Sequence, residues 1–406
     1  MTQTIRPLTP SSLSAAAKFT LANPTITASS TVVVDCNLDR TMLFGSPRTG
    51  TNNVLRKSLD QGRTWTDAAT FTGGAAAGSE TVSGVVNLPN GEILVSTNGT
   101  SFGYVYKSSG WAANPATATF ALKLTTRGGS FSNVWGFNNK CVSSDPSDGT
   151  VFISVYNGGQ TSSGGTDASN ISKARYCYLS VDFGETFALV YDVYLQPQAP
   201  NAQGCHIHAV CYDKLNKRLW ITFGDSTGAA STVAGAGNMY LAYSDNWATN
   251  PTAPTWNYVP IPAVLVSTVP QCTSIMVTAT HLILLPDLGV NYIIVFPFSA
   301  YRTLGSPRLG QVTGINGPVG KHLNRATPTS PILAAFNDTA GYLAGGYPSI
   351  QVTLDGYTWY TLYKDTASNN IDNRAFANVI CHMANGEIVT DYAGAIFRAT
   401  LVSPTA

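Results

Sequence analysis

The sequence predicts an all-β protein made of small four-stranded sheets that repeat along the chain. Short apolar runs that suit β-strands recur at close spacing over 406 residues, and no segment shows a long helical period. One hairpin motif recurs with them. Charged residues make up only 11% of the chain while glycine is abundant, which favours a protein rich in strands and loops.

The hairpin motif is clearest at residues 58–65, which read Ser-x-Asp-x-Gly-x-x-Trp. Strand patterns flank it on both sides. After Ser58, Asp60 can accept hydrogen bonds from nearby backbone amides, and Gly62 can adopt a positive φ. Trp65 can then fold back and bury its ring beneath the turn. The spacing therefore predicts a β-hairpin stapled by its own side chains.

Two further copies keep this order, and two weaker echoes occur at residues 107–111 and 243–247. The second copy has phenylalanine in place of tryptophan, and the third has lost one residue between aspartate and glycine. Their defining residues are Ser180, Asp182, Gly184 and Phe187 in the second, and Asp355, Gly356 and Trp359 in the third. The motif resembles the Asp-box, or bacterial neuraminidase repeat, of sialidase-like β-propellers. This resemblance implies a ring of blades.

The strand patterns group into seven units, at residues 31–71, 83–124, 132–191, 205–260, 272–314, 331–363 and 376–401. The last unit has only three strands, and residues 18–21 form an unassigned strand before the first. We expect this N-terminal strand to complete the last blade and close the ring, which removes an exposed edge. The prediction is a single seven-bladed β-propeller over residues 17–406 after an arm of residues 1–16. Because the fifth unit is poorly marked, six or eight blades stay open.

Composition argues against several classes of partner. The net charge is +1, so no overall field draws the chain to nucleic acid or to a membrane. No apolar run approaches the roughly 18 residues that span a bilayer, and the first 20 residues lack the apolar core of a signal peptide. The seven cysteines show no CxxC spacing, so we expect no metal site and no cofactor; free thiols and disulfides both stay open. We expect an extracellular or virion-surface location.

Ionisable residues gather where one predicted blade leads into the next. They are Arg127, His206, His208, His322, Arg325 and Arg374, and the tripeptide Asn-Arg-Ala occurs at both of the last two. Guanidinium groups bind carboxylates with two hydrogen bonds, so a shared rim of this kind suits an anionic sugar. Trp135 could stack on a sugar ring. The alternative is that these arginines tie neighbouring blades together.

The segment that most suggests a catalytic site contains His206, His208 and Tyr212. In a regular strand the two histidines face the same side, and imidazole suits general acid–base catalysis near neutral pH. The segment resembles one found in some propeller-fold polysaccharide lyases. There histidine and tyrosine transfer protons, and arginine neutralises a uronate. Metal binding and a structural role for the histidines are the alternatives.

We therefore expect the chain to recognise a surface polysaccharide or other anionic glycan, and in a catalytic version of this hypothesis to cleave it by β-elimination. Other virion proteins would be partners of the N-terminal arm in a phage-like spike, fibre or decoration protein. One alternative is a non-catalytic receptor-binding or structural virion propeller. The other is a sialidase-like exo-glycosidase. The sequence offers no evident Tyr–Glu nucleophile pair for a sialidase, although Glu80 and Asp225 are candidate acids.

Overall fold

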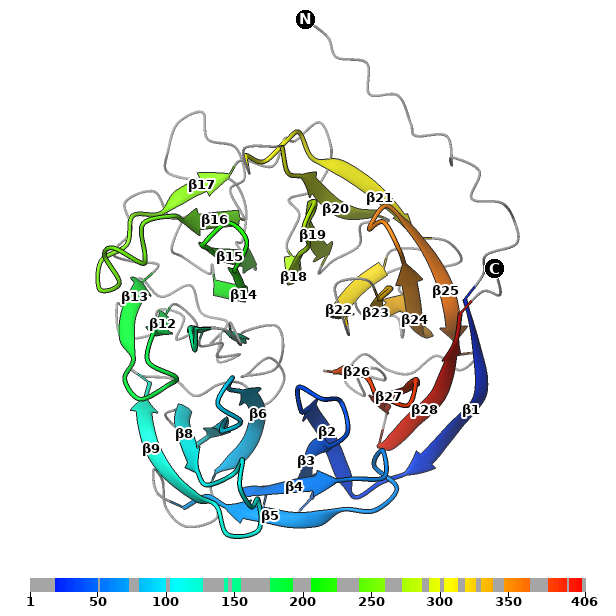
Figure 1. Ribbon diagram of the computed structural model, residues 1–406. Helices are drawn as coiled ribbons and strands as arrows, with labels where there is room; N and C mark the ends of the chain where they lie inside the picture. Colours follow the sequence, from blue (N-terminus) through cyan, green and yellow to red (C-terminus); the bar gives the residue numbers. More distant parts are fainter. Residues whose placement is uncertain are drawn as a thin grey trace, which may run out of the picture.

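The strands form seven four-stranded sheets, or blades, set in a ring around a central axis (Figure 1). Strands within a blade are antiparallel, and the first strand of each blade runs nearest the axis. The predicted seven-bladed β-propeller is therefore confirmed. This computed structural model describes residues 19–49, 52–72, 80–99, 103–126, 142–144, 148–154, 176–192, 206–224, 241–259, 272–286, 292–299, 303–312, 318–325, 330–338, 347–365, 379–392 and 394–403.

The first four blades follow one another along the chain, each ordered from the axis outward. Blade one consists of β2 (Thr31–Cys36), β3 (Leu43–Pro47), β4 (Val54–Ser58) and β5 (Thr66–Thr70). Blade two consists of β6 (Thr81–Asn87), β7 (Ile93–Asn98), β8 (Gly103–Ser109) and β9 (Thr119–Thr125). Blade three consists of β10 (Val142–Ser144), β11 (Val151–Ser154), β12 (Tyr176–Ser180) and β13 (Ala188–Asp192). Blade four consists of β14 (His206–Asp213), β15 (Arg218–Gly224), β16 (Leu241–Ser244) and β17 (Asn257–Val259).

The outer strands of blades five and six pair with each other, and blade seven combines strands from both ends of the chain. Blade five consists of β18 (Cys272–Val277), β19 (His281–Pro286), β20 (Tyr292–Pro297) and β21 (Arg308–Val312). Blade six consists of β22 (Pro318–Arg325), β23 (Ile332–Asp338), β24 (Tyr347–Thr353) and β25 (Thr358–Lys364). Blade seven consists of β26 (Ile380–His382), β27 (Glu387–Tyr392), β28 (Ala395–Val402) and β1 (Thr20–Ala28). A short parallel pairing of β21 with β25 joins the two outer edges.

The N-terminal strand closes the ring as the sequence predicts. β1 pairs antiparallel with β28 from Thr20 opposite Val402 to Ala28 opposite Ala395. The pairing is interrupted between Ala22 and Thr25, where Asn23 has a φ of 52° and Pro24 carries no amide hydrogen. A bulge and a proline of this kind protect an outer edge from further pairing. The predicted arm, residues 1–16, lies outside the described residues.

The core consists of apolar layers between neighbouring blades. Every residue of β7 and of β3 is buried, because the second strand of a blade has a neighbouring blade on each side. Trp220 of β15 and Trp359 of β25 have no exposed surface. The described residues contain no helix, and hence none long and apolar enough to cross a bilayer.

Candidate ligand-binding face

The two ends of the ring differ, and we name them by the chain connections they carry. Because strands alternate in direction, each blade's first strand begins at the same end at which its second and fourth strands finish. We call this end the entry face. The opposite end, which carries the hairpins between first and second and between third and fourth strands, is the turn face.

The longest connections join strand ends at the entry face. Five connections have 13 to 21 residues, and they join strand ends at this face: 126–141, 155–175, 193–205, 225–240 and 365–379. On the turn face the hairpins contain 3 to 12 residues. Four of these five connections involve blades three and four. One leads into blade three, one joins two strands within it, one joins blade three to blade four, and one joins two strands within blade four. Long loops on a rigid scaffold are where binding residues concentrate, so the entry face over these blades is the candidate site.

The turn face is occupied by the stapled hairpins, which fold as their sequence predicts. In the first, the Ser58 hydroxyl donates to Asp60 Oδ1 (2.7 Å) and accepts from the Gly62 amide (2.7 Å). The carboxylate of Asp60 accepts from the Thr64 amide (2.8 Å) and hydroxyl (2.6 Å). These hydrogen bonds lower the pKa of Asp60 to about 2, although partial burial opposes them. Trp65 Nε1 donates to the Gly62 carbonyl (3.2 Å), which completes the staple.

The other two copies repeat this geometry. Ser180 bonds Asp182 (2.8 Å) and the Gly184 amide (2.8 Å), as its counterpart does in the first staple. In the third copy Thr353 replaces serine, and its hydroxyl donates to Asp355 (3.1 Å) and accepts from the Gly356 amide (3.0 Å). Loss of one residue there moves the turn amides closer, so Asp355 accepts from two consecutive amides, Tyr357 and Thr358.

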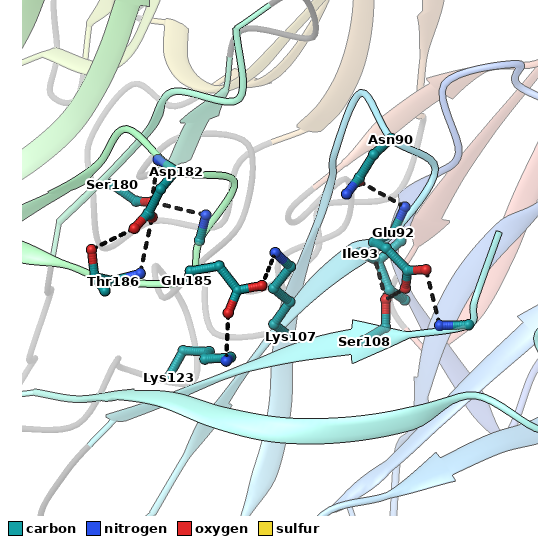
Figure 2. Close-up of polar contacts among 12 residues, drawn as sticks. Asn90, Glu92, Ile93, Lys107, Ser108, Lys123, Ser180, Asp182, Glu185 and Thr186 are labelled. Carbon is teal, nitrogen blue, oxygen red and sulfur yellow. Dashed lines mark hydrogen bonds and ion pairs between the residues drawn. The ribbon is translucent and has the colours of Figure 1, made fainter.

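The two weaker copies of the motif, at residues 107–111 and 243–247, also have a serine hydroxyl that donates a hydrogen bond, but the accepting group differs. In blade four Ser244 donates to Asn246 (3.1 Å), so an amide oxygen stands where the others have a carboxylate. In blade two Glu92, from the neighbouring hairpin, accepts from the Ser108 hydroxyl (2.5 Å) and the Gly110 amide (2.9 Å), as Figure 2 shows. The sequence pattern identified these hairpins but could not show which residue supplies the oxygen.

The residue after each staple glycine contacts the preceding blade. Arg63 pairs with Glu387 of blade seven (2.8 Å). Its equivalent Glu185 pairs with Lys107 (2.5 Å) and Lys123 (2.6 Å) of blade two (Figure 2), which lowers the pKa of Glu185. These are contacts between blades rather than to a ligand.

In the third staple the equivalent residue is Tyr357. Its ring packs edge-on against His281 of blade five, with 5.0 Å between ring centroids. All three complete staples therefore use this position to contact the preceding blade.

The staple glycines themselves lie against the preceding blade. A Cβ at Gly184 would lie 2.7 Å from a methyl of Leu94, and one at Gly356 would lie 2.8 Å from a methyl of Ile283. Each glycine also has a positive φ, 76° and 81°. The motif thus requires glycine twice, for the backbone conformation and for close packing.

The paired histidines of blade four lie at the entry end of β14, in an irregular part of the strand. His206 is its first residue, and only its backbone is described. His208 is 5% exposed and is the extra residue of a β-bulge between Ile207 and Ala209. The bulge interrupts the regular alternation of side chains, so the rule that residues two apart in a strand share one side does not carry over to this segment.

This bulge is not special to the histidines. The first strands β6, β18 and β22 carry register shifts near their entry ends as well, and β2 carries one between Val33 and Asp35. It is therefore a shared feature of the ring.

Tyr212 lies at the other end of the same strand. Its hydroxyl accepts from Lys217 Nζ (3.2 Å) and donates to Asp148 (3.4 Å), and its ring packs edge-on against Trp247. Tyr212 lies six positions after His206 along the strand, which is about 20 Å at the usual rise. The structure therefore does not bring the predicted proton-transfer groups together on one face.

His322 and Arg325 lie within the first strand of blade six, not in the connection before it. The strand pattern of the sequence predicts that this blade begins at residue 331 and that the preceding segment is a rim loop. β22 instead runs Pro318–Arg325, and Arg325 opposite Ile332 is its last residue, at the turn face. The prediction that Arg325 joins His206 on one rim is wrong, because these residues lie at opposite ends of their strands.

The remaining predicted site residues are Arg127, Trp135 and Arg374, and they lie outside the described residues. In the sequence Arg127 and Trp135 fall in the connection from β9 to β10, and Arg374 falls in the connection from β25 to β26. Asp225 also lies outside them.

The structure reveals a buried carboxylate–phenol pair that sequence reasoning missed. Glu80, just before β6 at the entry face, accepts hydrogen bonds from the Tyr106 hydroxyl (3.0 Å) and the Thr97 hydroxyl (2.6 Å). Glu80 is 2% exposed and Tyr106 is 4% exposed. Burial, with a smaller effect of the Glu80 charge, raises the pKa of nearby Tyr104. No local spacing links residues 80 and 106, so only the folded sheet brings them together.

A second buried group joins blades seven and one at the entry face. Arg48, which follows β3, forms an ion pair with Asp391 of β27. Arg48 also donates to the carbonyls of Ser29 (3.0 Å) and Ala395 (3.2 Å), so it links both blades to the chain between β1 and β2. Burial raises the pKa of Asp391 to about 6, although Arg48 opposes the shift.

Comparison with known proteins supports the fold alone. No family model matches the chain, and no curated protein sequence matches it. A solved structure of streptogramin B lyase is similar over 96% of this chain and 100% of its own, with 12% identity and a TM-score of 0.52. The β-propeller domain of Myceliophteria thermophila Cps50 (Swd1) is similar over 93% and 100%, with 9% identity and a TM-score of 0.51. The chain is thus a seven-bladed β-propeller.

Proposed function

We propose that this chain is an Asp-box propeller that recognises a polysaccharide or another anionic surface glycan through its entry face. The observation that carries this proposal is the asymmetry of the ring. All five long connections join strand ends at the entry face, whereas the staples of the turn face are used in contacts within and between blades. The three complete staples, with their Ser/Thr-Asp-Gly hydrogen bonds, support the assignment to the Asp-box class.

Residue chemistry on the entry face supports an anionic glycan. In the sequence Arg127 and Trp135 fall between β9 and β10 and Arg374 falls between β25 and β26, connections that join strand ends at this face, and His206 begins β14 there. Arginine binds carboxylates, and an indole ring stacks on a sugar. Tyr212 and Arg325 belong to the opposite face and are not part of this proposal. Because the proton-transfer pair of a lyase is then incomplete, we propose binding without cleavage, as in a virion spike or fibre.

The test is retention and sizing of acidic polysaccharides. Purified protein should retain an acidic polysaccharide on a glycan array or in co-sedimentation, and its chain length should stay unchanged. Arg127→Ala and Arg374→Ala should each weaken retention roughly tenfold, which corresponds to about 1.4 kcal/mol. Arg63→Ala, on the turn face, is the matched control and should bind as wild type does.

Two outcomes would contradict the proposal in different ways. Equal loss of binding in Arg63→Ala would place the site on the wrong face. Shortened chains with an unsaturated, ultraviolet-absorbing end would restore the lyase hypothesis, and His206→Ala should then abolish cleavage.

A sialidase-like hydrolase is the second candidate, because the Glu80–Tyr106 contact is an arrangement that a tyrosine nucleophile would use. Its burial between blades argues for a structural role. Release of fluorophore from a fluorogenic sialoside, lost in Tyr106→Phe, would favour the hydrolase. No release by the folded wild-type protein would exclude it.

A further inference from the structure

Three metal-ligating side chains meet at the contact between blades one and seven. Asp35 and Cys36 end β2, and Cys381 is the middle residue of β26. One carboxylate oxygen and the two sulfur atoms all lie within 4.8 Å of one another. In the described part of the chain, no other group of three such residues is as close together.

The geometry is near that of a tetrahedral metal centre. Zinc binds thiolate sulfur at about 2.3 Å and carboxylate oxygen at about 2.0–2.2 Å, so its ligand atoms lie roughly 3.5–3.8 Å apart. Rotamer adjustments of less than about 1 Å would bring the three atoms from their present separation to these values. Two thiolates with one carboxylate suit zinc, which accepts both soft and hard ligands.

The backbone around the three residues is well anchored. The Cys36 amide donates to Asp35 Oδ1 (2.7 Å), and its carbonyl accepts from Asn87 Nδ2 of blade two (2.9 Å). Across the contact, the Ala384 amide donates to the Arg40 carbonyl (2.9 Å), so the hairpins of blades seven and one are joined. Ligands held in this way need little reorganisation to bind an ion.

We propose that Asp35, Cys36 and Cys381 bind one zinc ion. Binding forms two zinc–sulfur bonds and one zinc–oxygen bond, and each thiol releases a proton to solvent. Cys381 is fully buried, whereas Cys36 is partly exposed, so water can occupy the fourth position from the side of Cys36. Because the ligands come from the first and the last blades, the ion would hold the ring closed at the turn face, opposite the Arg48–Asp391 pair.

Cobalt titration of the reduced full-length protein tests this. Cobalt(II) bound by two thiolates in a tetrahedral site gives a sulfur-to-metal charge-transfer absorption that zinc lacks. The absorption should saturate at one cobalt per chain, disappear on addition of zinc, and be lost in Cys36→Ser and in Cys381→Ser. Cys177→Ser removes a buried thiol of blade three and should leave it unchanged.

The two variants also report on folding. Cys36 ends its strand and is partly exposed, so Cys36→Ser is expected to fold even if Cys381→Ser does not. Zinc should raise the thermal unfolding midpoint of the wild type and of Cys177→Ser but not that of Cys36→Ser. Absence of the absorption in folded, reduced wild type would overturn the proposal. So would its persistence in a Cys36→Ser/Cys381→Ser double variant.

Discussion

Glycine in the staples is a residue-scale feature whose two roles can be separated. Gly184 of the second staple and Gly386 of the ordinary hairpin between β26 and β27 both have a positive φ, 76° and 85°, but only Gly184 lies against another blade. Gly386→Ala should cost about 1–2 kcal/mol of unfolding free energy from backbone strain alone. Gly184→Ala should cost a further 1–3 kcal/mol, roughly, because its methyl meets Leu94. Denaturant unfolding of both variants checks this, and equal costs would show that packing at Gly184 is unimportant.

Asp391 gives a residue-scale prediction about pH. Its folded pKa is about 6 against an ordinary value of 3.8, so between these values the folded state holds a proton that the unfolded state has released. The contribution of Asp391 to stability is therefore greatest below about pH 4 and falls as the pH rises through 6, by on the order of 1–3 kcal/mol.

The check is the difference in unfolding free energy between wild type and Asp391→Asn from pH 4 to pH 7. It should decline with rising pH. A difference that grows instead would mean that attraction to Arg48 outweighs burial and holds the pKa below its usual value.

At the scale of elements, ion pairs join the hairpin of one blade to the strands of the blade before it. Glu185 accepts from two lysines of blade two, but it is half exposed, so neutralising it in Glu185→Gln should cost no more than about 1 kcal/mol. Glu185→Lys places three ammonium groups together and should cost more at low salt than Glu185→Gln does. Urea unfolding at low and high ionic strength measures both, and the gap between them should shrink as salt screens the repulsion. A salt-independent gap would point to packing instead of charge.

Elements with a local signal could be predicted from the sequence, and elements without one could not. Each staple is defined within eight consecutive residues, so its turn and its aromatic residue follow from spacing. β22 contains Gly320, Lys321 and Asn324 with few apolar residues, so its sequence predicts a connection instead of a strand. Contacts between distant segments, such as Glu80 with Tyr106 or Cys36 with Cys381, leave no local pattern at all.

At the scale of the whole molecule, closure by β1 should decide whether the ring is stable. Deleting residues 1–28 removes the outer strand of blade seven and exposes the hydrogen-bonding edge of β28. Each lost backbone hydrogen bond contributes about 1 kcal/mol. We expect a lower thermal midpoint and concentration-dependent association in size-exclusion chromatography. Deleting only residues 1–16 leaves β1 intact and should have neither effect; an unchanged midpoint in the longer deletion would show that closure is dispensable.

Because the first strand pairs with the last, the ring can close only after the whole chain has been translated. β1 leaves the ribosome before any blade has formed. Its partner β28 is translated only after all the strands of blades one to six. On a polysome, several nascent chains would each carry an unmatched first strand beside the maturing ends of their neighbours. Exchange of β1 between such neighbours would yield strand-swapped dimers. β1 contains a proline and a bulge, and its threonine-rich sequence is mostly exposed. These features make the unpaired strand less prone to pair with other chains before β28 is available.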